Sequence, residues 1–132
     1  MQRSPLTASF GRDSGEIARA RAFIAAAARD WELTGLSQDL ELIVSELVSN
    51  ALIHGTGEVR VEVSVVGDAL RLQVGDDGGA SVPQLRIAGG VGGWGLRMVD
   101  ELADTWGTDP EVPGTLVWVV KSLPEPESDP TA

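Results

Sequence analysis

Cysteine is missing from the sequence, and histidine and lysine each occur once, as His54 and Lys121. The absence of cysteine excludes disulfides, thiolate metal sites and a cysteine nucleophile. A single histidine also excludes a cluster of several histidines around a metal. The single lysine follows an apolar run, whereas a P-loop needs its lysine within a glycine-rich loop to reach the phosphates. A Walker-type nucleoside triphosphatase is therefore excluded.

Basic residues are scarce, with ten against twenty acidic residues, and the formal net charge is −10. Such a charge repels nucleic acid, so no direct nucleic-acid contact is expected, whereas a basic protein partner is compatible with it. Long apolar runs are also missing. None approaches the roughly 20 residues that a bilayer span needs, and residues 1–10 lack the apolar core of a signal peptide. We therefore expect a cytoplasmic protein with no membrane contact.

A chain of 132 residues, 42% of them hydrophobic, is long enough to form one domain with a core of its own. We expect this domain to span residues 1–123. The remaining residues, 124–132, consist largely of proline and acidic side chains, and this composition predicts a disordered tail.

Hydrophobic periodicity predicts four strands and three helices. The strands are expected over residues 6–10, 59–65, 70–74 and 115–120. The first helix is expected from a cap at Asp13 to about Asp30, the second from a cap at Ser37 to near Gly55-Thr56-Gly57, and the third over residues 96–103. Asp13 and Ser37 stand where the caps of the first two helices are expected, and Gly67-Asp68 forms the turn of a hairpin.

A glycine-rich stretch over residues 80–95 predicts a mobile loop before the third helix. The predicted order of elements is therefore β-α-α-β-β-loop-α-β. This order implies an α+β fold, a two-layer α/β sandwich with the helices on one face of a mixed sheet.

Glu46, Asn50 and His54 recur every four residues in the second predicted helix and therefore line one stripe of it. The stripe borders the apolar face, whereas a solvated stripe would lie opposite that face. Two interpretations stay open. The stripe is a hydrogen-bond network along the helix edge, or it is a magnesium or phosphate site. In the second case Asn50 offers a neutral oxygen ligand, and Glu46 a carboxylate that orients or deprotonates a nucleophile.

Two glycine-containing motifs follow. Asp76-Asp77-Gly78-Gly79 ends a predicted strand and is either a plain turn or a fixed carboxylate that accepts a hydrogen bond from an exocyclic amine. Gly92-Gly93-Trp94-Gly95-Leu96 opens the third helix and is either a flexible linker or an anion site made of backbone N–H groups. No βαβ unit surrounds these glycines, so a dinucleotide-binding fold does not fit.

In order and spacing, these motifs resemble the GHKL superfamily of gyrase, histidine kinases and mismatch-repair MutL, whose ATPase domain is the Bergerat fold. The resemblance covers about residues 10–121. Four stretches carry it: Glu46-Leu47-Val48-Ser49-Asn50-Ala51 with His54-Gly55, Asp76 with Gly78, Gly93-Trp94-Gly95-Leu96, and Gly114-Thr115. The short form of the first motif and the compact size are similar to one branch, the bacterial anti-sigma factor serine kinases.

This resemblance implies ATP and Mg²⁺ as cofactors. It implies that Asn50 ligates the Mg²⁺, that Asp76 with Gly78 receives the adenine amino group, and that Thr115 lies near the adenine. Gly93-Trp94-Gly95-Leu96 would be the lid glycine motif, which closes over the ATP in this family. The backbone N–H groups of Gly93, Gly95 and Leu96 would bind phosphate oxygens. Glu46 would be the general base, while His54 is interpreted as structural.

The resemblance further implies a serine/threonine protein kinase that phosphorylates an anti-anti-sigma (STAS-type) protein and binds a sigma factor, and it admits a homodimer. The sequence departs from the family pattern in three respects. Ala80 replaces a glycine, Trp94 fills a slot that is commonly smaller, and Val91-Gly92 stands where family kinases often carry a cation. Because charge neutralisation is a large part of phosphoryl transfer, a second reading stays open: a nucleotide-gated binding module with weak or no catalysis.

Overall fold

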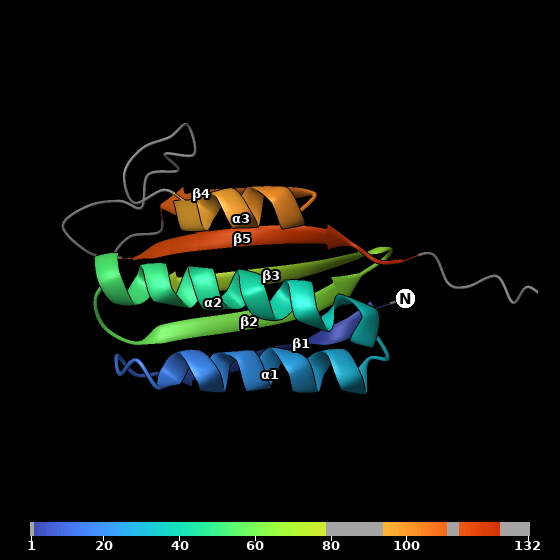
Figure 1. The fold of residues 1–132 in the computed structure, drawn as a ribbon, viewed down its shortest axis with the longest axis horizontal. Helices are drawn as coiled ribbons and strands as arrows, with labels where there is room; N and C mark the ends of the chain where they lie inside the picture. Colours follow the sequence, from blue (N-terminus) through green and yellow to red (C-terminus); the bar gives the residue numbers. More distant parts are fainter. Residues whose placement is uncertain (1, 79–93, 111–113, 125–132) are drawn as a thin grey trace, which may run out of the picture.

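The computed structural model describes residues 2–78, 94–110 and 114–124. These residues form two layers, a sheet and three helices that cover one of its faces (Figure 1). The strands are β1 (Gln2–Phe10), β2 (Val59–Val66), β3 (Ala69–Asp76), β4 (Thr105–Pro110) and β5 (Thr115–Ser122). The helices are α1 (Glu16–Asp30), α2 (Ser37–His54) and α3 (Trp94–Leu102), with a 3-10 turn at Thr34–Leu36 before α2. The predicted α+β sandwich is confirmed.

The sheet has the strand order β1-β2-β3-β5-β4. Every described strand pairing is antiparallel, so the expectation of a mixed sheet was wrong. The strand β4 was also not predicted, because Gly107 and Pro110 indicate a stop in the sequence. Both residues are tolerated here since β4 pairs only with β5 and lies at the edge of the sheet.

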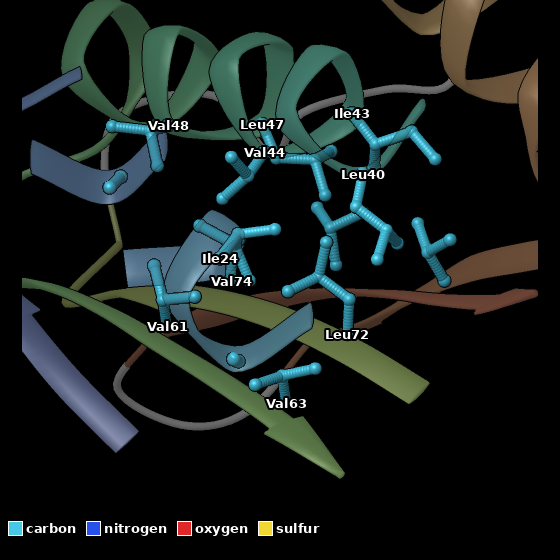
Figure 2. Close-up of a cluster of buried hydrophobic side chains, with 14 of the residues drawn as sticks. Ile24, Leu40, Ile43, Val44, Leu47, Val48, Val61, Val63, Leu72 and Val74 are labelled. Atoms are coloured by element: carbon cyan, nitrogen blue, oxygen red, sulfur yellow. The ribbon is translucent and has the colours of Figure 1, made fainter. Parts of the chain in front are cut away.

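The core lies between the helices and the covered face of the sheet (Figure 2). Helix α2 contributes one continuous buried face, and β2 and β3 contribute alternate residues, as the periodicities of 3.6 and 2 require. The largest fully buried side chains are Ile24, Leu40, Ile43, Leu47, Leu70, Leu72, Val44, Val48, Val59, Val61, Val63 and Val65. Each buried aliphatic side chain contributes roughly 1.5–3 kcal/mol to stability.

Both predicted helix caps were wrong. In α1 the N-cap position belongs to Gly15, whose N–H donates to Asp13 Oδ1 at 3.2 Å in a turn before the helix. In α2 it belongs to Leu36, because the 3-10 turn leads directly into the helix and leaves Ser37 inside it. The Ser37 hydroxyl instead donates to Glu41 Oε2 at 2.9 Å.

Two predicted segments lie largely outside the described residues, the loop over 80–95 and the tail over 124–132. Of the loop, the structure describes only Trp94 and Gly95, which belong to α3, and of the tail only Pro124. None of the helices in the described ranges is long and apolar enough to cross a bilayer.

The single lysine connects three elements at the end of the sandwich where α2 begins. Lys121 Nζ donates to Leu102 O at 2.6 Å and forms an ion pair with Asp39 Oδ2 at 3.1 Å. Its side chain is only 14% exposed, so removal of the ammonium leaves the last carbonyl groups of α3 poorly satisfied.

We predict that Lys121→Met lowers the free energy of unfolding by about 1–3 kcal/mol, the range for loss of a part-buried charged hydrogen bond. Urea denaturation followed by circular dichroism measures this. Arg19→Met is the control, because Arg19 is 75% exposed and its ion-pair partner within the described part of the chain is Glu16 of the same helix. Its loss should change stability by less than about 0.5 kcal/mol. Equal midpoints for the two variants would contradict the structural role given to Lys121.

Candidate functional site

Four element ends meet at one end of the sandwich, on the left in Figure 1: the end of α2, the end of β3, the start of α3 and the start of β5. Two neighbour relations bring them together, since α3 packs beside α2 and β3 pairs with β5. The described residues of three motifs fall at these ends, namely Asp76 with Gly78, Gly95 with Leu96, and Gly114 with Thr115. Asn50 lies in the last turns of α2, and Glu46 lies one turn earlier in the same helix.

Asp76 is the central polar group of this region and is only 5% exposed. Its Oδ1 accepts hydrogen bonds from the Gly78 N–H at 2.6 Å and from the Thr115 hydroxyl at 3.0 Å. Thr115 reaches it because the two residues are partners in the β3–β5 register. No residue in the described ranges donates to Oδ2. One carboxylate oxygen is thus fixed by the protein and the other has capacity to accept a donor from a ligand.

Two glycines allow the backbone to approach Asp76 closely. A Cβ on Gly55 would collide with the carboxylate carbon and with both oxygens, and a Cβ on Gly114 would collide with the Asp76 carbonyl oxygen. Any larger residue at either position would displace the aspartate. Asp76 is therefore packed so closely by Gly55 and Gly114 that no space is left for a methyl group on either glycine.

The segment Gly55–Gly57 forms a second layer of contacts that the sequence analysis missed. Thr56 O accepts the Asp77 N–H at 2.9 Å, and the Thr56 hydroxyl donates to Gly78 O. Gly57 has φ +74°, and a Cβ there would collide with the Asp77 carboxylate. From the sequence, Gly55-Thr56-Gly57 was interpreted as the end of the second helix, with Gly55 as the last residue of the first motif. Two glycines around a threonine are more than a helix end requires, and this excess was the available sign of a close backbone contact.

The polar stripe of α2 borders its buried face, as predicted. Glu46 and Asn50 are half-buried beside the buried Leu47 and Ala51, whereas His54 is exposed at the last position of the helix. No side chain in the described ranges hydrogen-bonds to Glu46 or Asn50, so the predicted helix-edge network is not formed among these residues. Two half-buried polar side chains on α2 therefore have no protein partner within the described ranges.

The described residues contain no group of three acidic, histidine or cysteine side chains that could hold a metal by themselves. This composition suits Mg²⁺ bound together with phosphates, since Mg²⁺ keeps several waters and takes few protein ligands in nucleotide sites. Asn50 offers one amide oxygen for this purpose. A dedicated all-protein metal site does not fit the described residues.

The lid glycine motif is described only in part. Gly95 and Leu96 lie in the first turn of α3, where backbone N–H groups have no partner within the helix. Arg97 follows them and is exposed. Gly93 lies outside the described residues, as do Ala80 and the Val91-Gly92 pair. The described part presents donors for an anion beside the end of α2.

A hollow of about 400 Å³ crosses strands β1, β2, β3 and β5. Arg60 and Glu62 line it, and these residues alternate along β2 with the buried Val61. It therefore opens on the sheet face that the helices leave uncovered. Among the described residues of the four predicted motifs, Thr115 alone lines it.

The chain matches the histidine kinase-like ATPase domain family over residues 11–121. Its fold is similar to the crystal structure of the RsbU and RsbW domains of Rv1364c from Mycobacterium tuberculosis, with a TM-score of 0.70 and 22% identity over 92% of this chain and 33% of that one. The chain thus spans about a third of that structure. It is also similar to the Acinetobacter baumannii histidine kinase AdeS, with a TM-score of 0.54 and 14% identity over 89% of this chain and 68% of that one. No curated protein matches the chain.

We predict that Gly55→Ala lowers the free energy of unfolding by about 1–3 kcal/mol, because the new methyl group must displace the Asp76 carboxylate. Gly35→Ala is the matched control, since a Cβ at Gly35 meets nothing within 4 Å. Urea denaturation of both variants measures the difference. If the two variants are equally stable, Asp76 is not packed against Gly55.

Proposed function

Because the chain belongs to the histidine kinase-like ATPase domain family, we propose that it is an ATP- and Mg²⁺-dependent serine/threonine protein kinase of the anti-sigma factor type. It would phosphorylate a STAS-type anti-anti-sigma protein and bind a sigma factor to regulate transcription. The observation that carries the proposal is the buried Asp76 carboxylate, with one oxygen fixed by Gly78 and Thr115 and the other available. Family membership implies ATP as the ligand. The roles of individual residues and the identity of the partners are part of our proposal.

Base recognition is assigned to Asp76, Gly78 and Thr115. Oδ2 of Asp76 would accept the exocyclic amino group of adenine, while Gly78 and Thr115 hold Oδ1 and prevent the carboxylate from turning away. A site built around an acceptor selects adenine over a base with a carbonyl at the same position, because the carbonyl would leave a buried acceptor unpaired.

Phosphate and metal binding is assigned to α2 and α3. Asn50 would hold Mg²⁺ through its amide oxygen, and the bound ion neutralises charge on the phosphates. Backbone N–H groups of Gly95 and Leu96, in the first turn of α3, would donate to phosphate oxygens, and we assign the same role to Gly93. The packing of α3 beside α2 supports a common phosphate site.

Glu46 is proposed as the general base. It lies one turn before Asn50 on the same stripe and is half-buried without a partner among the described residues, so its carboxylate is available for a proton. The acceptor hydroxyl oxygen would form a bond to the γ-phosphorus as the bond to the bridging oxygen breaks. The hydroxyl proton would pass to Glu46, and ADP would leave.

The partner assignments rest on charge and on family likeness. A net charge of −10 suits a basic partner, such as the nucleic-acid-contacting surface of a sigma factor. The similar RsbW domain belongs to a structure that also contains an RsbU domain, which supports a role in partner-switching regulation. Such a role, and the need for ATP, support a cytoplasmic location. We retain a homodimer and the domain bounds of 1–123 as part of the proposal.

We predict that ATP binds in a Mg²⁺-dependent manner and that Asn50→Ala lowers the affinity at least tenfold, because the amide oxygen is the metal ligand supplied by α2. Isothermal titration calorimetry with and without Mg²⁺ measures this. Gln38→Ala is the control, an exposed amide near the other end of the same helix, and should bind as the wild type does. Magnesium-independent binding, or equal affinities for the two variants, would contradict the metal assignment.

We predict that Glu46→Gln keeps ATP affinity and lowers phosphoryl transfer at least 100-fold, the size of a general-base contribution. Radiolabelled ATP and STAS-type proteins of the source organism provide the assay, with the exposed Glu101→Gln as the control. Transfer at the wild-type rate in Glu46→Gln would remove Glu46 from the mechanism.

A second candidate is a nucleotide-gated binding module without catalysis. It is favoured by the Val91-Gly92 pair, which leaves no cation immediately before the lid glycine motif to neutralise the γ-phosphate. Wild-type protein that binds ATP, changes its affinity for a partner and transfers no label would establish this alternative.

A further inference from the structure

Arg12, which lies between β1 and α1, makes four hydrogen bonds, and all of them go to backbone carbonyl oxygens. Its Nη2 donates to Leu52 O at 2.7 Å, to Gly55 O at 2.8 Å and to Ala51 O at 3.1 Å. Its Nη1 donates to Gly57 O at 3.0 Å. No carboxylate in the described ranges forms an ion pair with this guanidinium, so its charge is directed only at the end of α2 and the segment after it.

These contacts suit the end of a helix. The last carbonyl groups of a helix have no intrahelical partner and carry the negative end of the helix dipole, so a cation with several donors is favourable there. The guanidinium also continues past the helix end to Gly57. A single side chain therefore fixes both the last turn of α2 and the turn that leaves it.

The same turn, Gly55–Gly57, also contacts the residues that we propose to bind the adenine base. Thr56 contacts Asp77 and Gly78 through two hydrogen bonds, and Gly55 packs directly on the Asp76 carboxylate. Movement of Gly55–Gly57 would therefore remove the backbone that packs against the Asp76 carboxylate. Arg12 binds the carbonyl oxygens of Gly55 and Gly57 in this turn, and its other two hydrogen bonds tie the same guanidinium to the last turn of α2.

We propose that Arg12 is a positioning residue for base recognition, which holds Gly55–Gly57 against Asp76 and so keeps the free carboxylate oxygen in place. This inference rests on the proposed function, since it takes Asp76 as the adenine acceptor. Arg12 itself contacts no nucleotide in this arrangement. Its effect is carried by the backbone of residues 55–57.

The first test needs no nucleotide. In Arg12→Ala, hydrogen exchange should accelerate at least tenfold at the Asp77 amide, which donates to Thr56 O, and at the Gly78 amide, which donates to Asp76 Oδ1. The central sheet amides of Val63 and Leu72 should keep their rates. Arg12→Lys retains a charge and part of the donor set, so its rates should be intermediate. Arg19→Ala removes an exposed arginine with only a local partner and should match the wild type.

The second test measures base selectivity, comparing ATP with inosine triphosphate, which carries a carbonyl in place of the exocyclic amine. Arg12→Ala should lose at least tenfold in ATP affinity and much less in inosine triphosphate affinity, and Arg12→Lys should recover part of the selectivity. A merely structural role would lower both affinities by the same factor in the folded protein.

The outcomes separate the two proposals. Wild-type protein that binds no ATP refutes the proposed function, and the exchange rates still decide whether Arg12 holds the turn. Unchanged exchange at Asp77 and Gly78 in Arg12→Ala, or an unchanged selectivity ratio, overturns the inference about Arg12. If Arg12→Ala does not fold, Arg12→Lys decides, because it must show faster exchange at Asp77 and Gly78 and a lower selectivity ratio than the wild type.

Discussion

A carboxylate buried at the end of a sheet is stable only if the surrounding backbone supplies its hydrogen bonds and comes close enough to exclude water. Asp76 meets this condition through Gly78 and Thr115 on one side and the bare Cα of Gly55 on another. These contacts depend on other parts of the structure. They need the β3–β5 register that pairs Asp76 with Thr115, the path of the chain after α2, and glycine at the positions that touch Asp76.

Helix α2 serves two purposes because of its orientation on the sheet. One face is buried among aliphatic side chains and supplies a large part of the core. The border of that face carries Glu46 and Asn50, and the end of the helix leads into the turn that packs on Asp76. A change that tilts α2 would therefore alter stability and the proposed site together. Arg12 and Lys121 hold contacts near its two ends and limit such a tilt.

The sequence predicted the parts of the fold that have strong periodicity. The buried face and the end of α2 and the β2–β3 hairpin follow from the sequence pattern, whereas the start of α2 was predicted one residue late. The family resemblance was confirmed. The edge strand β4 was missed because it contains glycine and proline, yet Gly107 is needed there, since a Cβ would lie 2.6 Å from Trp118 Cζ2. The contacts of Arg12 and of Gly55–Gly57 were also missed. In each of these contacts at least one partner is a backbone atom, and the two partners are 20 or more residues apart in the sequence, so the contacts leave no residue pattern there.

The proposed function requires that the nucleotide bind at the Asp76 end of the sandwich. A crystal structure with a non-hydrolysable ATP analogue and Mg²⁺ would locate the nucleotide. We expect the exocyclic amine to donate to Asp76 Oδ2 and the metal to lie on the Asn50 amide oxygen. Nucleotide bound instead in the hollow lined by Arg60 and Glu62 on the uncovered face of the sheet, or an adenine that does not touch Asp76, would contradict it.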